Sequence, residues 1–101
     1  MYYFEQGFPS HIKRFIESFP KSGNLACQTE SYCWANRLKQ NAAKLQITSL
    51  TIEHGFYYIN GESPEGHTWI RVDGIIFDPT AGQFEDNGHG AYEAHEDEEL
   101  M

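Results

Sequence analysis

The segment 67–84, HTWIRVDGIIFDPTAGQF, constrains the fold more than any other part of this chain. Its first six residues alternate between two faces, as a half-buried β-strand does. Asp73 and Gly74 then form a two-residue loop suited to a type I′ turn, in which both central residues have positive φ. The segment therefore predicts a tight hairpin in which Val72 lies opposite Ile75.

The register of this hairpin determines which side chains share a face. It places Trp69 opposite Asp78, and one face then carries His67, Trp69, Asp78 and Thr80. His67 lies diagonally from Asp78, at a Cβ separation somewhat under about 7 to 8 Å, so the two side chains can meet. A carboxylate there would hold one imidazole nitrogen as a donor and leave the other free to accept a proton. A general base paired with a nucleophile requires this arrangement.

Two helices are expected ahead of the sheet. Ser10 is a good N-cap, and apolar residues then recur at helical spacing until Pro20 ends the run. A second helix is expected to extend to about residue 45. Its apolar stripe consists of Trp34, Leu38, Ala42 and Leu45. Both helices are interpreted as core-facing.

From Ile47 onward the pattern changes to β, with Gly55 marking a turn into a second strand at 56–59 and a loop at 61–66. Together with the hairpin, this predicts an α+β fold in which N-terminal helices pack on an antiparallel sheet of about four strands. Residues 1–90 are expected to form a single domain. The segment 91–101 holds five carboxylates within its last nine residues and is interpreted as an acidic tail, either disordered or the tip of an exposed helix.

Composition excludes several classes of function. The net charge is -8, and the seven Lys and Arg residues are spread along the chain, so nucleic acid is not an expected partner. No apolar stretch approaches the roughly 20 residues of a membrane span, and the first residues lack the order of a signal peptide, which favours a cytoplasmic protein. No cofactor is expected. The histidines that could be imagined as metal ligands lack tight ligand spacing, and they are His54, His67, His89 and His95.

The two cysteines, Cys27 and Cys33, are too few for a disulfide framework, and both compete as a nucleophile. The N-terminus of a helix favours thiolate over thiol. If the second helix begins near Thr29 or Ser31, Cys33 lies in its first turn; if it begins near Asn24, Cys27 takes that place. Cys27 also falls on the apolar stripe and is equally explained as a buried thiol. Periodicity leaves the choice open.

Three short motifs resemble those of the transglutaminase-like and papain-like cysteine proteins. His67-Thr68-Trp69 resembles the His-x-Trp strand of that group, and Asp78-Pro79-Thr80 with Gln83-Phe84 resembles the Asp-Pro-Thr segment that follows it. Cys33-Trp34-Ala35-Asn36 resembles the Cys-Trp-Ala of papain and the Cys-aromatic-x-Asn of small phage and bacterial members. The resemblance covers about residues 24–84. The chain departs from the group in its short length, its tight His-to-Asp hairpin and the lack of a glycine before the nucleophile.

This resemblance implies a minimal papain-like core with a Cys-His-Asp triad, and it favours Cys33 over Cys27 as the nucleophile beside His67 and Asp78. Supporting roles are implied for Gln28, Trp69 and Thr80, although Gln28 is also explained as a polar residue at a helix entrance. The implied activity is hydrolysis or acyl transfer at an amide, peptide or isopeptide bond through a thioester, with the backbone N–H of the nucleophile facing the oxyanion. The expected partner is a peptide or protein substrate.

A second hypothesis is a binding module that kept this fold and lost turnover, such as a small phage protein that engages a host factor. Its acidic surface would suit a basic partner. The state of the thiol separates the two hypotheses, because a thiolate that persists near pH 6 supports the enzyme.

Overall fold

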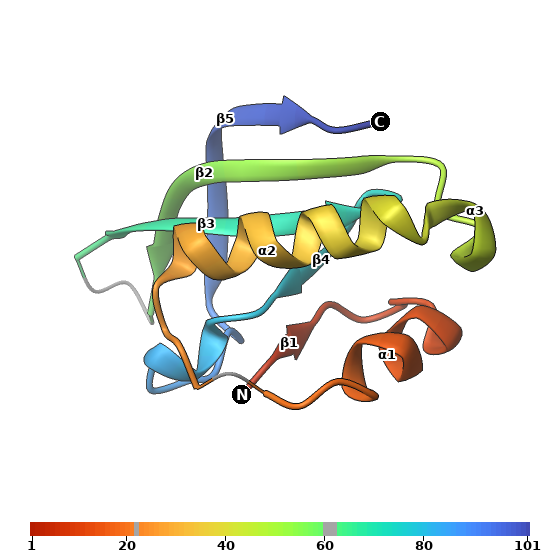
Figure 1. Ribbon diagram of the computed structural model, residues 1–101. Helices are drawn as coiled ribbons and strands as arrows, with labels where there is room; N and C mark the ends of the chain where they lie inside the picture. Colours follow the sequence, from red (N-terminus) through yellow and green to blue (C-terminus); the bar gives the residue numbers. More distant parts are fainter. Residues whose placement is uncertain (22, 60–62) are drawn as a thin grey trace.

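The computed structural model describes residues 1–21, 23–59 and 63–101, and within them it is an α+β fold, as the sequence predicts. The described residues form a five-stranded antiparallel sheet in the order β1-β4-β3-β2-β5, with three α-helices (Figure 1). The strands are β1 (Tyr3–Phe4), β2 (Leu50–Tyr58), β3 (Glu65–Val72), β4 (Ile75–Asp78) and β5 (Ala91–Glu99). The helices are α1 (Ser10–Glu17), α2 (Cys27–Gln40) and α3 (Ala42–Leu45), and a short 3-10 helix, η1 (Ala81–Gln83), follows β4.

The helices bury the apolar stripes expected of them. In α1 these residues are Ile12 and Ile16, while the second stripe, from Trp34 to Leu45, is buried over α2 and α3. The expected second helix is divided at Asn41, whose backbone leaves helical geometry. Helix α2 packs against β3 and β2 and so covers one face of the sheet (Figure 1). None of the helices in the described ranges is long and apolar enough to cross a membrane.

The hairpin between β3 and β4 has the predicted register. Val72 pairs with Ile75, and Asp73 and Gly74 both have positive φ, at 49° and 82°. The Asp73 carboxylate also accepts hydrogen bonds from the backbone amides of Thr48 and Ser49, at 2.9 and 2.7 Å. The turn is therefore fixed both by its backbone preference and by its contact with the segment that leads into β2.

Gly55 does not make the expected turn. Strand β2 continues through it, and its pairing with β5 shifts register between His54 and Gly55. A Cβ added at Gly55 would lie 1.9 Å from the carbonyl oxygen of Glu93, so glycine is required there by the close approach of two backbones at a bulge. The expected loop at 61–66 falls partly outside the described residues, and its last two residues belong to β3.

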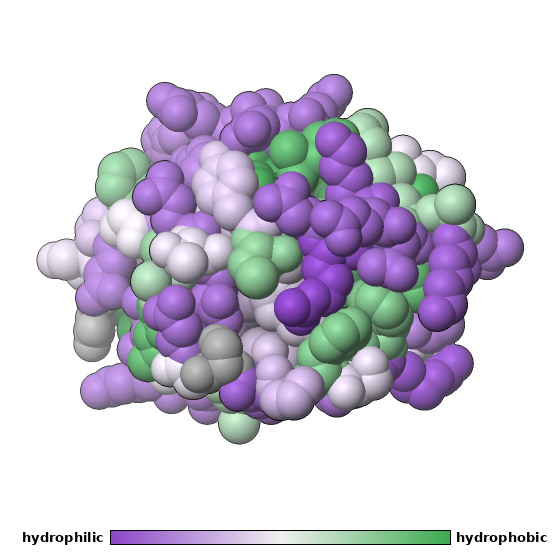
Figure 2. All heavy atoms as spheres, in the orientation of Figure 1, coloured by the Kyte–Doolittle hydropathy of each residue, from purple (hydrophilic) through white to green (hydrophobic). Residues whose placement is uncertain are grey.

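The expectation of an acidic tail at 91–101 was wrong. Residues 91–99 form β5, which pairs antiparallel with β2 and bends as it passes along the sheet (Figure 1). The strand was not predicted because its sequence is strongly charged and lacks an apolar face. Such a sequence is compatible with a strand here because only one edge of β5 pairs and nearly all of its side chains are exposed. The expected four strands become five in the described residues, because the two strands expected on either side of Gly55 are the single strand β2, and β1 and β5 were not anticipated. The surface in the orientation of Figure 2 is mainly hydrophilic, with separate hydrophobic patches.

Candidate active site

His67 and Asp78 form a buried pair where β3 and β4 lie side by side. The Nε2 atom of His67 lies 2.7 Å from Oδ2 of Asp78, and neither side chain has exposed surface. Their contact agrees with the face that the hairpin register predicts. Because Nε2 faces a carboxylate, it carries the proton, and Nδ1 is left to exchange a proton with another group.

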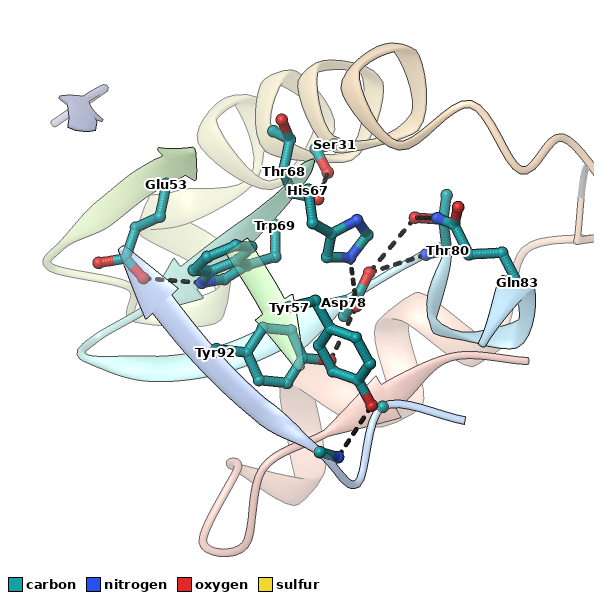
Figure 3. A network of polar contacts seen from close by, with 12 residues as sticks. Ser31, Glu53, Tyr57, His67, Thr68, Trp69, Asp78, Thr80, Gln83 and Tyr92 are labelled. Carbon is teal, nitrogen blue, oxygen red and sulfur yellow. Dashed lines mark hydrogen bonds and ion pairs between the residues drawn. The ribbon is translucent and has the colours of Figure 1, made fainter. Parts of the chain in front are cut away.

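The Asp78 carboxylate is held by several donors (Figure 3). The backbone N–H of Thr80 donates to Oδ1 at 3.0 Å, and the Tyr92 hydroxyl donates to Oδ2 at 2.8 Å. Gln83 in turn donates from Nε2 to Oγ1 of Thr80 at 3.0 Å. The sequence-predicted Thr80 therefore supports Asp78 rather than His67, through a turn that follows the end of β4.

Aromatic rings enclose the imidazole. The rings whose centroids lie within 6.2 Å of it belong to Tyr57, Trp69, Phe84 and Tyr92. Trp69 is fully buried, stacks on His67 and donates its indole N–H to Oε1 of Glu53 at 2.7 Å. The rings exclude water from the His67–Asp78 contact, which strengthens its electrostatic interaction.

Cys27 supplies the thiol beside His67. It is the first residue of α2 and is half-buried, and Oδ1 of Asn24 accepts the preceding amide, that of Ala26, at 2.9 Å. Interaction with His67 is the largest cause that lowers the pKa of the Cys27 thiol; burial opposes it, and the amide and hydroxyl of Thr68 assist it. These neighbours favour the thiolate.

The contact between His67 and Cys27 lacks an ordinary hydrogen bond. The buried Nδ1 of His67 has no hydrogen-bond partner of ordinary geometry, although the Cys27 side chain acts on its titration. The structure therefore brings the thiol near Nδ1 of His67 without a hydrogen bond of ordinary geometry.

His67 is biased toward its charged form. Burial lowers the pKa of His67, but the hydrogen bond to Asp78, the interaction with the Cys27 side chain and the charges of both groups outweigh it and raise the pKa to about 9. A raised pKa on the imidazole and a lowered pKa on the thiol both favour transfer of the thiol proton to His67.

The structure brings Cys27, and not the preferred Cys33, beside His67. Cys33 is exposed and lies six residues into α2, where its N–H is within the reach of the carbonyl four residues earlier and so is not available to an oxyanion. The helix begins at Cys27, closer to the start near Asn24 that the sequence left open as an alternative than to a start near Thr29 or Ser31. The motif that follows Cys33 instead contributes Trp34 to the core.

The expected oxyanion donors are also found at Cys27 rather than at Cys33. The amides of the first turn of α2 have no carbonyl partner within the helix, and they belong to Cys27 and the residues that follow it. Gln28 is exposed and comes directly after Cys27 rather than before it. Its role as a donor therefore stays a prediction.

Three contributors were missed by sequence reasoning. Tyr92 comes from the segment interpreted as a tail, Tyr57 lies beside His67, and Thr68 contacts Cys27 from β3. The alternation of Thr68 with His67 was visible in the sequence, but the contact of Thr68 with Cys27 at the start of α2 was not. Only a strand prediction for Ala91 and Tyr92 would have signalled the first of these.

Other arrangements find less support. Among the described residues, no group of three or more His, Cys, Asp or Glu side chains lies close enough to hold a metal ion.

The chain matches none of the protein-family models, curated proteins or solved structures with which it was compared. The function of the chain is therefore inferred from the geometry of the site itself.

Proposed function

We propose that this chain is a cysteine-dependent hydrolase or acyl-transferase that acts on amide or peptide bonds. Cys27 is the nucleophile, His67 the acid and base, and Asp78 the residue that orients the imidazole. The observation that carries the proposal is the buried His67, which contacts Asp78 through Nε2 at 2.7 Å and directs its otherwise unpartnered Nδ1 toward the thiol at the start of α2.

The chemistry follows from the roles of these groups. The Cys27 thiolate attacks the carbonyl carbon, and a C–S bond forms while the C=O electron pair moves to oxygen. When the tetrahedral intermediate collapses, the C–N bond breaks and His67 gives the Nδ1 proton to the departing amine, which leaves a thioester. Water or an amine then attacks the thioester, His67 removes its proton, and Cys27 departs as thiolate.

Stabilisation of the oxyanion is supported by the position of Cys27. Its own N–H and the next amides of the first turn of α2 point away from the helix body, and the helix dipole adds partial positive charge at that end. A carbonyl oxygen held there would gain hydrogen bonds as its negative charge develops. In comparable sites each such donor lowers the barrier to reaction by on the order of 3 kcal/mol.

The experiment that tests the proposal is the pH dependence of iodoacetamide labelling, with the modified cysteine located by peptide mapping. Wild type, Cys27→Ser and Cys33→Ser form a matched set, because each variant removes one thiol. Rapid labelling of Cys27 below pH 7, unchanged in Cys33→Ser, is expected. A thiol at Cys27 that titrates near its ordinary pKa of about 8.5 would overturn the proposal.

A second measurement tests turnover rather than reactivity. Incubation with a panel of peptide esters and amides should give an acyl adduct on Cys27, detected as a mass increase on the intact chain. The adduct should be lost on addition of hydroxylamine, which cleaves thioesters. Wild type and Cys33→Ser should both form it, and Cys27→Ser should not.

The exposed acidic strand favours a second candidate function, a binding module without turnover. Five carboxylates lie on β5, at one edge of the sheet, and their side chains are exposed: Glu93, Glu96, Asp97, Glu98 and Glu99. Such a surface would attract a basic partner in a manner that weakens with salt. An ordinary thiol at both cysteines, with no acyl adduct, would favour this function.

A further inference from the structure

The segment after the hairpin carries a residue that reaches into the candidate site. Tyr92 lies near the start of β5, and its hydroxyl donates to Oδ2 of Asp78 at 2.8 Å (Figure 3). The same oxygen accepts the hydrogen bond from Nε2 of His67, at 2.7 Å. We propose that Tyr92 is a positioning residue of this site, which holds the Asp78 carboxylate against His67 and shares its negative charge.

The sharing follows from the number of donors on one carboxylate. Asp78 has no exposed surface, so protein groups must replace the water that would otherwise solvate its charge. Thr80 supplies donors to Oδ1, and Tyr92 is the second donor to the oxygen that His67 uses. Each donor withdraws electron density from the carboxylate, which then attracts the imidazolium proton less strongly.

Tyr92 keeps its proton under all conditions relevant here. Burial and the charge and hydrogen bond of Asp78 raise the pKa of the Tyr92 hydroxyl far above its usual range. The hydroxyl is therefore the donor and the carboxylate the acceptor at any physiological pH. The titratable groups around this pair come from several elements: Tyr3 of β1, Cys27 of α2, Tyr57 of β2, His67 of β3, Asp78 of β4, and Asp86 after η1, which accepts from the Tyr57 hydroxyl.

The fold fixes Tyr92 in this position from two directions. In the pairing of β5 with β2, Tyr92 lies opposite Tyr57. The Tyr92 ring also stacks on Tyr3, with centroids 5.9 Å apart. The Tyr57 hydroxyl also accepts the amide of Gly90 at 2.8 Å, which anchors the chain just before β5. A side chain held this firmly loses little further entropy when it donates to Asp78.

The consequence for catalysis depends on the proposed function. His67 must hold a proton beside the thiolate and then release it to the leaving amine, and an imidazole that binds its proton too tightly is a poor acid. Tyr92 lowers the proton affinity of His67 by competing for Asp78. The strand that supplies Tyr92 is therefore part of the site, and not only a cover for the edge of the sheet.

The test measures the pKa of His67 directly, by NMR titration of its imidazole nitrogens in wild type, Tyr92→Phe and Tyr58→Phe. Tyr58→Phe is a matched control, because its hydroxyl also donates to a carboxylate, that of Glu93 on β5, at 3.1 Å, but in an exposed position away from His67. Tyr92→Phe should raise the pKa of His67 by about half a unit to one unit, as expected for loss of one hydrogen bond to a charged group. Tyr58→Phe should leave it unchanged.

A second variant keeps the inference testable if Tyr92→Phe fails to fold. Replacement of Tyr92 by 3-fluorotyrosine retains the ring and makes the hydroxyl a stronger donor, so it should lower the pKa of His67. An unchanged pKa in both variants, or a shift in the opposite direction, would overturn the inference. The result is independent of turnover: an ordinary Cys27 thiol in the wild type would refute the proposed function, whereas the response of His67 to Tyr92 would still be measured.

Discussion

The two cysteines of α2 lie six residues apart and occupy different chemical environments. Cys27 is the first residue of the helix, half-buried, and it interacts with His67 and with both the amide and the hydroxyl of Thr68. Cys33 is exposed on the second turn. We therefore expect the place of a thiol relative to the helix start and the neighbouring strand to decide its reactivity, whatever motif surrounds it.

Two stabilising effects coincide only at the start of the helix. The unpaired amides and the positive end of the dipole act within the first turn, and they do not extend to Cys33. The imidazole of His67 reaches the same end because β3 passes beneath α2, where Ser31 donates to the carbonyl of Thr68 at 3.2 Å. Variants that remove one neighbour at a time measure how much each neighbour contributes to the contrast between the cysteines.

Removal of the imidazole should have the largest effect. In His67→Ala the Cys27 thiol loses the main cause of its lowered pKa, and at pH 6.5 an ordinary thiol is only about one per cent ionised. Labelling of Cys27 at that pH should therefore slow by roughly a hundredfold. Labelling of Cys33, followed in the same sample by peptide mapping, should not change. Equal slowing at both cysteines would indicate unfolding and would remove the contrast.

Loss of the charge on Asp78 should have a smaller effect. Asp78→Asn keeps the size of the side chain, but it removes the charge and the carboxylate acceptor that raise the pKa of His67. The imidazolium is then less populated, and labelling of Cys27 at pH 6.5 should slow by about tenfold, since a pKa change of one unit changes the ionised fraction tenfold. Asp97→Asn, on the exposed β5, is the matched control and should match the wild type. A slower Cys27 in the control would show that net charge, rather than Asp78, controls the thiol.

Sequence reasoning reached one half of this site and missed the other for identifiable reasons. The approach of His67 to Asp78 follows from the period of a strand and the two-residue turn at Asp73, both of which are local rules. The start of α2 does not follow from local rules, because Thr29 and Ser31 are better caps than Ala26, the residue that precedes the helix. Tertiary contact between Cys27 and β3 outweighs that preference.

The missed strand has a different explanation. The alternating pattern that identifies a strand depends on one buried face, but β5 is an edge strand with charged, exposed side chains. Its pairing is specified instead by Gly55, where only a glycine allows the backbone of Glu93 to approach. A glycine in a strand was interpreted as a turn, and so the partner that it admits was not predicted, nor was Tyr92.

The dependence of stability on pH should also separate the cysteines. The pKa of His67 is raised to about 9 in the folded chain, so its contribution to stability is complete below the unfolded value of about 6.5 and is lost as the pH rises through 9. The lowered pKa of Cys27 acts in the opposite sense: its contribution is complete above the unfolded value of about 8.5 and is lost as the pH falls through the folded pKa.

In the wild type these two contributions oppose each other between about pH 6.5 and 8.5, because the His67 contribution falls as the pH rises and the Cys27 contribution falls as the pH decreases. Cys27→Ser removes one of them, so the free energy of unfolding of this variant should fall by about 1 kcal/mol across that range. Urea denaturation at several pH values measures it. Cys33→Ser should retain the pH profile of the wild type; the same decline in both variants would contradict the assignment of the pair to Cys27.

The smallest expected effect concerns Thr68, which contacts both Cys27 and His54. Its hydroxyl lowers the pKa of the Cys27 thiol and lies 2.9 Å from Nδ1 of His54. Valine has nearly the same shape and favours a strand, and it keeps the backbone amide, so Thr68→Val removes only the hydroxyl. Because His67 remains the dominant neighbour, labelling of Cys27 at pH 6.5 should slow by only about threefold, which corresponds to roughly half a unit in its pKa. Thr51→Val, on the neighbouring β2, controls for the loss of a hydroxyl from the sheet. A Thr68→Val variant as slow as His67→Ala would mean that the thiolate is stabilised chiefly by the strand, and the role of base would then no longer be required of His67.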